Sequence, residues 1–285
     1  MLGQAPPTRS GSSRSLCETL MPFPETPRVL YAINPLDKVL CQLRFPTILR
    51  VATELPAAFQ ERVRDRYPLF QQRALSLPVP VPAQIAQQLG LQLNLGTGEV
   101  AYEFSTEDGL WEVSLTKDFL ALSTHEYQRW EGFKEYLALP LAALLDVYAP
   151  AFFSRIGLRY NDVIVRSKLG LEVVEWGELL QPHAAAELGE PGVAACVENS
   201  HRRVDIRLAD GRGKVRLQHG FVDHAETREV CYLIDSDFYT DERTETQDAG
   251  AVLDNFNRQS GRLFRWCITS RLHEAMGPRD LASLG

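Results

Sequence analysis

The chain has 285 residues, of which 45% are hydrophobic and 24% are charged, a composition typical of a folded globular protein with a substantial core. Its formal charge of -7 argues against a general nucleic-acid-binding protein, which needs an excess of Lys and Arg to neutralise phosphates. The five cysteines are dispersed and form no CxxC pair, which indicates reduced thiols in a cytoplasmic protein rather than disulfides or a zinc site.

The beginning of the chain is rich in Ser, Arg and Pro and has no continuous apolar run. We therefore predict a disordered extension at 1–20 and no secretory signal. Met21 directly precedes the first segment with strand character and is a second candidate start of translation, beside Met1. The most apolar window, 137–153, is interrupted by prolines and an aspartate and is shorter than the roughly 20 residues that a bilayer requires. We expect no membrane contact.

The first half begins with strand patterns that start at Arg28 and, after a turn signal, at 38–45. A helix is expected next, with Thr53 as its cap and Pro68 as its end. Its buried face is predicted to consist of Phe59, Val63 and Tyr67. Residues 71–92, rich in Pro and Gln, then resemble a connector or a lightly structured cover of the sheet.

Three short strand patterns follow, at 100–104, 110–115 and 119–123, and an Asp108-Gly109 turn joins the first two. They predict an antiparallel meander. Ser123 and Glu126 then match a capping box, which predicts that a long helix opens at Ser123 and ends near Pro150. The apolar face predicted for this helix comprises Trp130, Phe133, Leu137, Leu141, Leu144 and Leu145.

The second half repeats this order of elements. A short helix at 175–180 precedes strand patterns at 203–208, 214–222 and 230–239, and a helix is expected from about 248 to 270. Its predicted buried face comprises Leu253, Phe256, Ser260, Leu263 and Cys267.

The fold class predicted from this pattern is α+β, with a pseudo-duplicated antiparallel sheet architecture. Two successive units, each of helix, three-stranded antiparallel meander and helix, are expected over 21–170 and 171–285.

No catalytic signature occurs in the sequence. It contains no GxSxG nucleophile elbow, no phosphate-binding GxxxxGK[ST] loop, no HExxH and no GxGxxG after a strand. We therefore predict no cofactor and no catalytic residue.

The run FFSRIGLRYNDVIV at 152–165 alternates as a strand that sends Arg155, Arg159 and Asn161 to one face. Arginines on a central strand need carboxylate partners, and Asp235 and Asp237 share one face of the corresponding strand in the second half. An ion-pair network between the halves is our main interpretation. A groove for an anion or ligand is the alternative.

Asp235 and Asp237 are also the candidates for holding a divalent cation together with phosphate oxygens. The acidic loop at 241–248 argues against a cation site, because Asp235 and Asp237 are then only the start of a solvated acidic segment. We predict no metal site.

Arg258, Arg262 and Arg265 recur at i, i+4 and i+7 and form a basic stripe on the last long helix. Such a stripe is usually a solvated face, and otherwise it binds phosphates or an acidic partner.

Four motifs carry a resemblance to a known family: GLRY at 157–160, PLDKVLCQLRFP at 35–46, WEVSLTKDFLALSTHEYQRWEGF at 111–133 and YLIDSDFY at 232–239. Together they resemble a sporadically distributed family of uncharacterised bacterial proteins, over nearly everything from Met21 onward. Here Asn161 follows GLRY directly, where the family has an apolar residue in between, and Asn255 or Asn257 stands where its last helix often has His. The patchy distribution implies a mobile accessory gene, such as a defence or toxin–antitoxin module.

The sequence as a whole predicts a cytoplasmic, non-catalytic protein that binds a partner protein encoded nearby. One alternative is a metal-dependent enzyme acting on phosphoesters or nucleotides, with Asp235 and Asp237 on the cation and Arg155 and Arg159 on phosphate. The other is a nucleic-acid-binding accessory protein that uses the basic stripe, although the net charge makes nucleic acid an unfavoured partner.

Overall fold

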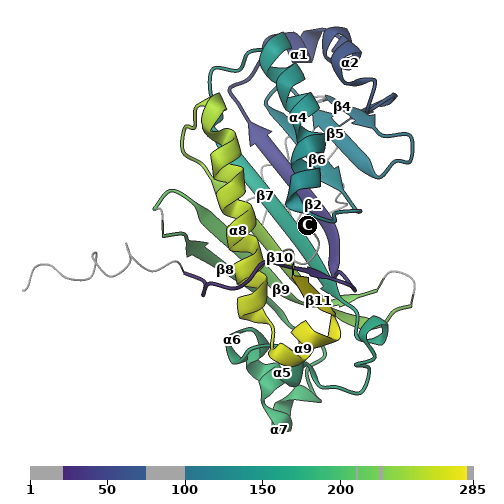
Figure 1. The fold of residues 1–285 in the computed structure, drawn as a ribbon, viewed down its shortest axis with the longest axis vertical. Coiled ribbons are helices and arrows are strands. Elements are labelled where there is room, and N and C mark those ends of the chain that lie inside the picture. Colours follow the sequence, from purple (N-terminus) through teal and green to yellow (C-terminus); the bar gives the residue numbers. More distant parts are fainter. Residues whose placement is uncertain (1–21, 75–99, 210, 225–226, 281–285) are drawn as a thin grey trace, which may run out of the picture.

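The computed structural model describes residues 22–74, 100–209, 211–224 and 227–280, whose strands form one nine-stranded antiparallel sheet and a separate two-stranded pair. Two long helices, α4 (Trp130–Val147) and α8 (Ala249–Cys267), lie across one face of the large sheet (Figure 1). In order across the sheet, the strands are β3 (Leu69–Ala74), β4 (Val100–Ser105), β5 (Trp111–Leu115), β6 (Phe119–Thr124), β2 (Leu36–Arg44), β7 (Arg155–Ile164), β10 (Val230–Thr240), β9 (Lys214–Asp223) and β8 (His201–Arg207).

Shorter elements connect and flank these layers. The two-stranded pair joins β1 (Val29–Tyr31) to β11 (Pro278–Asp280). The short α-helices are α1 (Leu49–Thr53), α2 (Ala57–Val63), α5 (Trp176–Leu179), α6 (Pro182–Ala185), α7 (Pro191–Ala194) and α9 (Ser270–Ala275).

Alternation along the central strands decides which side chains meet the helices. On β7, Ile156, Leu158 and Ile164 are fully buried on the helix side. Phe238 of β10 contacts Phe256 of α8, with ring centroids 6.2 Å apart. The hydrophobic core therefore lies between the sheet and the two long helices, and the intervening residues of these strands occupy the opposite face of the sheet.

Both long helices bury the faces that their periodicity predicts. On α8, Leu253, Phe256, Ser260, Leu263 and Cys267 are all buried, as expected. On α4, the apolar face is likewise confirmed, with Leu141 and Leu145 half-buried against the core. Burying one such leucine is worth about 1.5 to 3 kcal/mol, so these two stripes attach the helices to the sheet.

The expected start of the first long helix is wrong. Ser123 and Thr124 are the last residues of β6, and α4 begins only at Trp130, without a side-chain cap. Ser123 is opposite Leu40 of β2 and Glu112 of β5. Pairing with two neighbouring strands prevails over the local capping pattern, because each of those ladders satisfies backbone groups that a cap alone would leave open.

Two further local expectations need correction. Thr53 ends α1 instead of capping a helix, and α2 follows Pro56, although Phe59, Val63 and Tyr67 are buried as predicted. The first residues of the expected connector 71–92 belong to strand β3, which pairs with β4. The rest of that connector, and the expected disordered extension at 1–20, lie outside the described residues.

The fold is mixed α and β with antiparallel strands, and both expected halves contribute to one sheet. The central neighbours are β2 and β7, which pair over most of their length. The expected boundary between residues 170 and 171 follows β7, so strand pairing crosses from 21–170 into 171–285 between β7 and β10.

None of the helices in the described ranges combines the length and the apolarity needed to cross a bilayer.

Candidate functional site: a basic, aromatic pocket between the two long helices

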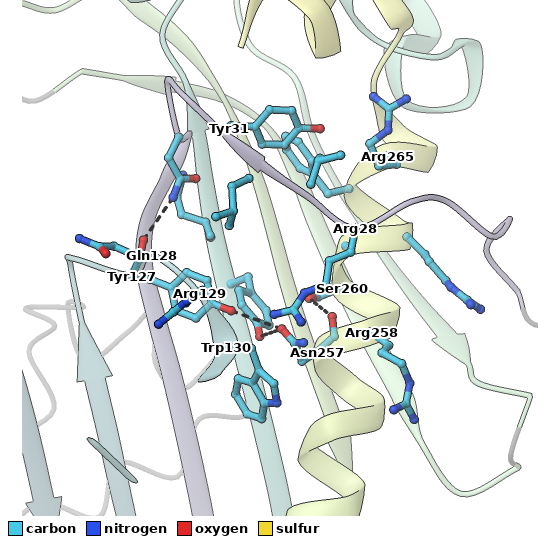
Figure 2. A pocket seen from close by; sticks show the side chains of 18 of the residues that line it. Arg28, Tyr31, Tyr127, Gln128, Arg129, Trp130, Asn257, Arg258, Ser260 and Arg265 are labelled. Carbon is cyan, nitrogen blue, oxygen red and sulfur yellow. Dashed lines mark hydrogen bonds between the residues drawn. The ribbon is translucent and has the colours of Figure 1, made fainter. Parts of the chain in front are cut away.

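A cavity of about 490 Å³ lies between α4, α8, β7 and the N-terminal segment 23–31 (Figure 2). We call segment 23–31 the strap and the cavity the α4–α8 pocket. Its volume falls within the range of roughly 300 to 1,000 Å³ that is typical of ligand sites in proteins.

The strap forms one wall of the pocket and is held at Phe23 and at Arg28. The Phe23 side chain is 1% exposed, and its ring packs 5.5 Å from that of Trp266 on α8. Arg28 forms two hydrogen bonds, of 2.7 and 3.0 Å, with the Glu131 carboxylate on α4. The strap therefore links the two long helices across the pocket.

Hydroxyl and amide groups form a hydrogen-bonded cluster inside the pocket. Tyr160 of β7 donates to Asn257 Oδ1 at 3.0 Å, and Tyr127, from the loop before α4, donates to the same oxygen at 3.3 Å. The Ser260 hydroxyl donates to the backbone carbonyl of Asn257 at 2.8 Å. Burial raises the pKa of Tyr160 well above its usual value, so its hydroxyl stays neutral and remains a donor.

Asp162 is a buried carboxyl group on the wall of the pocket. It is 6% exposed, and alternation along β7 places it on the helix side with Tyr160. Burial, with the nearby Asp235 carboxylate as a second cause, raises the pKa of Asp162 to about 8. Within the described residues, its carboxyl group has no ion pair and no hydrogen bond. The neutral acid is therefore the dominant form at pH 7.

The lining of the pocket is positively charged, although the chain as a whole carries a formal charge of -7. Six basic and three acidic residues line it, a difference of plus three. The basic residues are Arg28, Arg129, Lys134, Arg258, Arg262 and Arg265, and the acidic residues are Glu131, Asp162 and Asp254.

Several of these cations have no carboxylate partner. Among the described residues, Arg129, Arg258 and Arg265 form no ion pair, whereas Arg262 pairs with Glu25 at 2.9 Å. The Nη1 atoms of Arg262 and Arg265 are buried without a hydrogen-bond partner. The hydroxyl of Tyr31 points toward Arg265 (Figure 2). The pocket thus has guanidinium groups whose donors are not fully used, a condition that favours an anionic ligand.

The residues singled out in the sequence lie on two opposite faces of the sheet. Arg258, Arg262 and Arg265 line the α4–α8 pocket. Arg155, Arg159, Asn161, Asp235 and Asp237 lie on the other face of β7 and β10. The two sets therefore do not form one site, because the sheet separates them.

On that second face, the expected ion pairs between β7 and β10 are present. Arg159 holds Asp235 through two hydrogen bonds of 2.7 and 2.5 Å, and Arg155 bonds Asp237 at 2.9 Å. Asn161 is directly opposite Asp235 in the strand register. Burial raises the pKa of Asp237, and the positive charges of the neighbouring arginines partly oppose this rise. The charges compensate one another, as expected for a structural network.

No group of three or more His, Cys, Asp or Glu side chains suited to a metal ion occurs in the part of the chain that the structure describes. Asp235 and Asp237 lie on one face of β10, and their carboxylates form ion pairs with Arg159 and Arg155. A divalent cation there would have to displace these partners.

Four residues of the pocket were not predicted as members of a site, namely Asp162, Tyr127, Tyr160 and Asn257. One signal was present, because Asp162 stands at an inward position of a strand whose other inward residues are apolar or aromatic. An acidic residue in such a position is buried, and buried carboxyl groups cluster at functional sites.

Comparison with known proteins finds no family model and no curated protein that matches this chain. The family suggested by the GLRY and YLIDSDFY motifs therefore stays a prediction.

Proposed function

We propose that this chain is a non-catalytic binding protein that holds an acidic segment of a partner protein in the α4–α8 pocket. The observation that carries the proposal is the positive lining of this pocket in a chain of net negative charge. The proposed partner is encoded nearby, in a mobile defence or toxin–antitoxin module of the kind that the sequence motifs suggest. That the protein binds rather than catalyses rests on the missing catalytic signatures of the sequence.

The composition of the pocket supports a protein as the ligand. Tyr31, Tyr127 and Trp130 line it beside the arginines. Tyr, Trp and Arg are the residue types that contribute most of the binding energy in protein–protein interfaces. At a separation of 4 Å and an effective dielectric constant of about 20, one carboxylate–guanidinium pair is worth roughly 4 kcal/mol before desolvation.

The two-unit layout proposed from the sequence offers a reason for the position of the pocket. In that layout α4 belongs to the unit 21–170 and α8 to the unit 171–285. Two helices from duplicated units would meet at the junction between them, and such junctions are common ligand sites.

The alternatives have less support. The phosphoester enzyme needs Arg155, Arg159, Asp235 and Asp237 as free ligands, and these four side chains already pair with one another. A nucleic-acid-binding stripe needs exposed cations along α8, and the Arg262 side chain is only 18% exposed and pairs with Glu25. Both therefore rank behind partner binding.

The test is capture of the products of adjacent genes by the tagged chain after co-expression. We expect one of these products to bind the wild type and to be lost from the double variant Arg258→Glu and Arg265→Glu. The control of equal charge change is the double variant Arg64→Glu and Arg207→Glu, because both arginines are exposed, one at the C-terminal end of α2 and one on β8, and neither lines the pocket. If capture survives in the double variant, or if no adjacent product binds, the proposal is wrong.

A further inference from the structure

Asp162 differs from the other buried carboxyl groups of the described residues. These are Glu103, Asp162 and Asp235, all at most 6% exposed. Asp235 is held by Arg159, and Glu103 is bonded by Gln71 and paired with Arg73 at 3.1 Å. Asp162 has neither a cation nor a hydrogen-bond donor in the described ranges.

An unpaired buried carboxyl group destabilises the fold, so its presence needs a reason. Replacing Asp162 by Asn or Leu would break no hydrogen bond and no ion pair of its side chain with the described residues. It lines the pocket, where a bound group can reach it. The partner that suits it is a cation with several hydrogen-bond donors, since this offsets the cost of ionising the acid in a buried position.

From this geometry we infer that the pocket takes a zwitterionic polypeptide segment, whose ammonium group binds Asp162 while its carboxylate binds the arginines of α8. The inference rests on the proposed function and extends it, because it states which groups the acidic partner segment must carry. The ammonium is either the amino terminus of the partner or a lysine side chain within its acidic segment.

The position of the groups along the pocket is consistent with such a ligand. Asp162 comes from β7 in the sheet, whereas Arg258 and Arg265 come from α8, which lies across one face of that sheet (Figure 1). Tyr31 lies near both groups, because the Asp162 and Arg265 charges each act on its hydroxyl. Asp162 and the arginines of α8 therefore call for opposite charges in a ligand, and a ligand carrying only negative charge would leave Asp162 without a partner.

The inference is tested with three synthetic peptides and the full chain. The probes are Gly-Glu-Glu-Gly amide with a free amino terminus, the same peptide acetylated, and acetyl-Lys-Glu-Glu-Gly amide. Binding is measured by calorimetry or by NMR titration at low ionic strength. We expect the free-terminus or the lysine peptide to bind wild type about tenfold more tightly than the acetylated peptide, and the better of the two identifies the source of the ammonium.

The matched variant is Asp162→Asn, which keeps the shape and removes a buried acid, so it is expected to fold. In this variant the tenfold preference should disappear, so that the three peptides bind with similar affinity. Arg265→Gln should weaken all three peptides.

Two outcomes overturn the inference. One is equal binding of all three peptides to wild type, and the other is a tenfold preference that persists in Asp162→Asn. If all three bind equally and Arg265→Gln weakens them, the ammonium inference fails while the proposed acidic-segment function stands. Binding of none of the peptides also counts against the inference, and the proposed function is then judged by the capture experiment.

Discussion

Arg159 and Asp235 form a bidentate ion pair across the central strands β7 and β10, with the carboxylate almost fully buried and the guanidinium half-exposed. The residue directly opposite Arg159 in the register is Asp237, so the pair is diagonal. Arg155 likewise pairs diagonally with Asp237. The two pairs join strands from the two halves of the sequence, which suits a structural role.

We predict that Arg159→Ala lowers the free energy of unfolding by roughly 3 to 5 kcal/mol, because it leaves the buried Asp235 carboxylate without its partner. Arg155→Ala should cost less, since the Asp237 side chain is 18% exposed and solvent partly replaces the lost cation. Urea unfolding of both variants measures the difference. Equal and small losses would show that neither pair stabilises the fold.

The raised pKa of Asp162 should make the free energy of unfolding fall as the pH rises. Its pKa is raised from the usual 3.8 to about 8 by burial and by Asp235, so between these values the folded state binds a proton that the unfolded state has lost. The stabilising proton is fully present below about pH 4 and lost as pH rises through 8. Tyr31, Tyr127 and Cys267 are the other titratable groups near it.

The measurement is chemical unfolding of wild type and Asp162→Asn from pH 5 to pH 9. Because each unit of pKa difference corresponds to about 1.4 kcal/mol, wild type should lose on the order of a few kcal/mol relative to the variant over this range. A constant difference between the two proteins would contradict the prediction.

Gly261 offers a way to fill the pocket without disturbing the core. It lies in the interior of α8 and lines the pocket, and a Cβ added there meets no atom within 4 Å. Gly261→Ala should stabilise the protein by about 0.5 to 1 kcal/mol through helix propensity. Gly261→Trp should keep the fold and abolish ligand binding.

Gly250 is the matched control, because it lies on the same helix outside the pocket and a Cβ there also has open space. Gly250→Trp should leave binding unchanged. Thermal melting and binding of the peptide probes test both positions. Retained binding in Gly261→Trp would place the ligand elsewhere.

The two anchors of the strap should differ strongly in their contribution to stability. Phe23→Ala removes a ring that is 1% exposed and packed on Trp266, so it should cost about 3 to 5 kcal/mol. Arg28→Ala breaks a pair whose side chains are 49% and 48% exposed, and it should cost less than about 1 kcal/mol. Thermal unfolding of the two variants is the measurement, and a reversed order would mean that the Arg28–Glu131 pair is the main anchor.

Local pattern determined much of this protein. Periodicity alone predicts the buried face of α8, from Leu253 to Cys267, and the strands that became β5 and β9. These predictions succeed because a stripe at helical or strand spacing leaves the chain few ways to bury it. Charge and alternation likewise predicted that Arg155 and Arg159 would meet Asp235 and Asp237.

Only the tertiary structure decided the rest. Ser123 has a capping pattern, but pairing with β2, more than 80 positions earlier in the chain, extends β6 through it. The pocket likewise joins Arg28, Tyr127, Asp162 and Asn257 from four distant segments. Sequence spacing contains no information about such proximity, because the burial of each segment's apolar face on a common core is what brings these polar groups together.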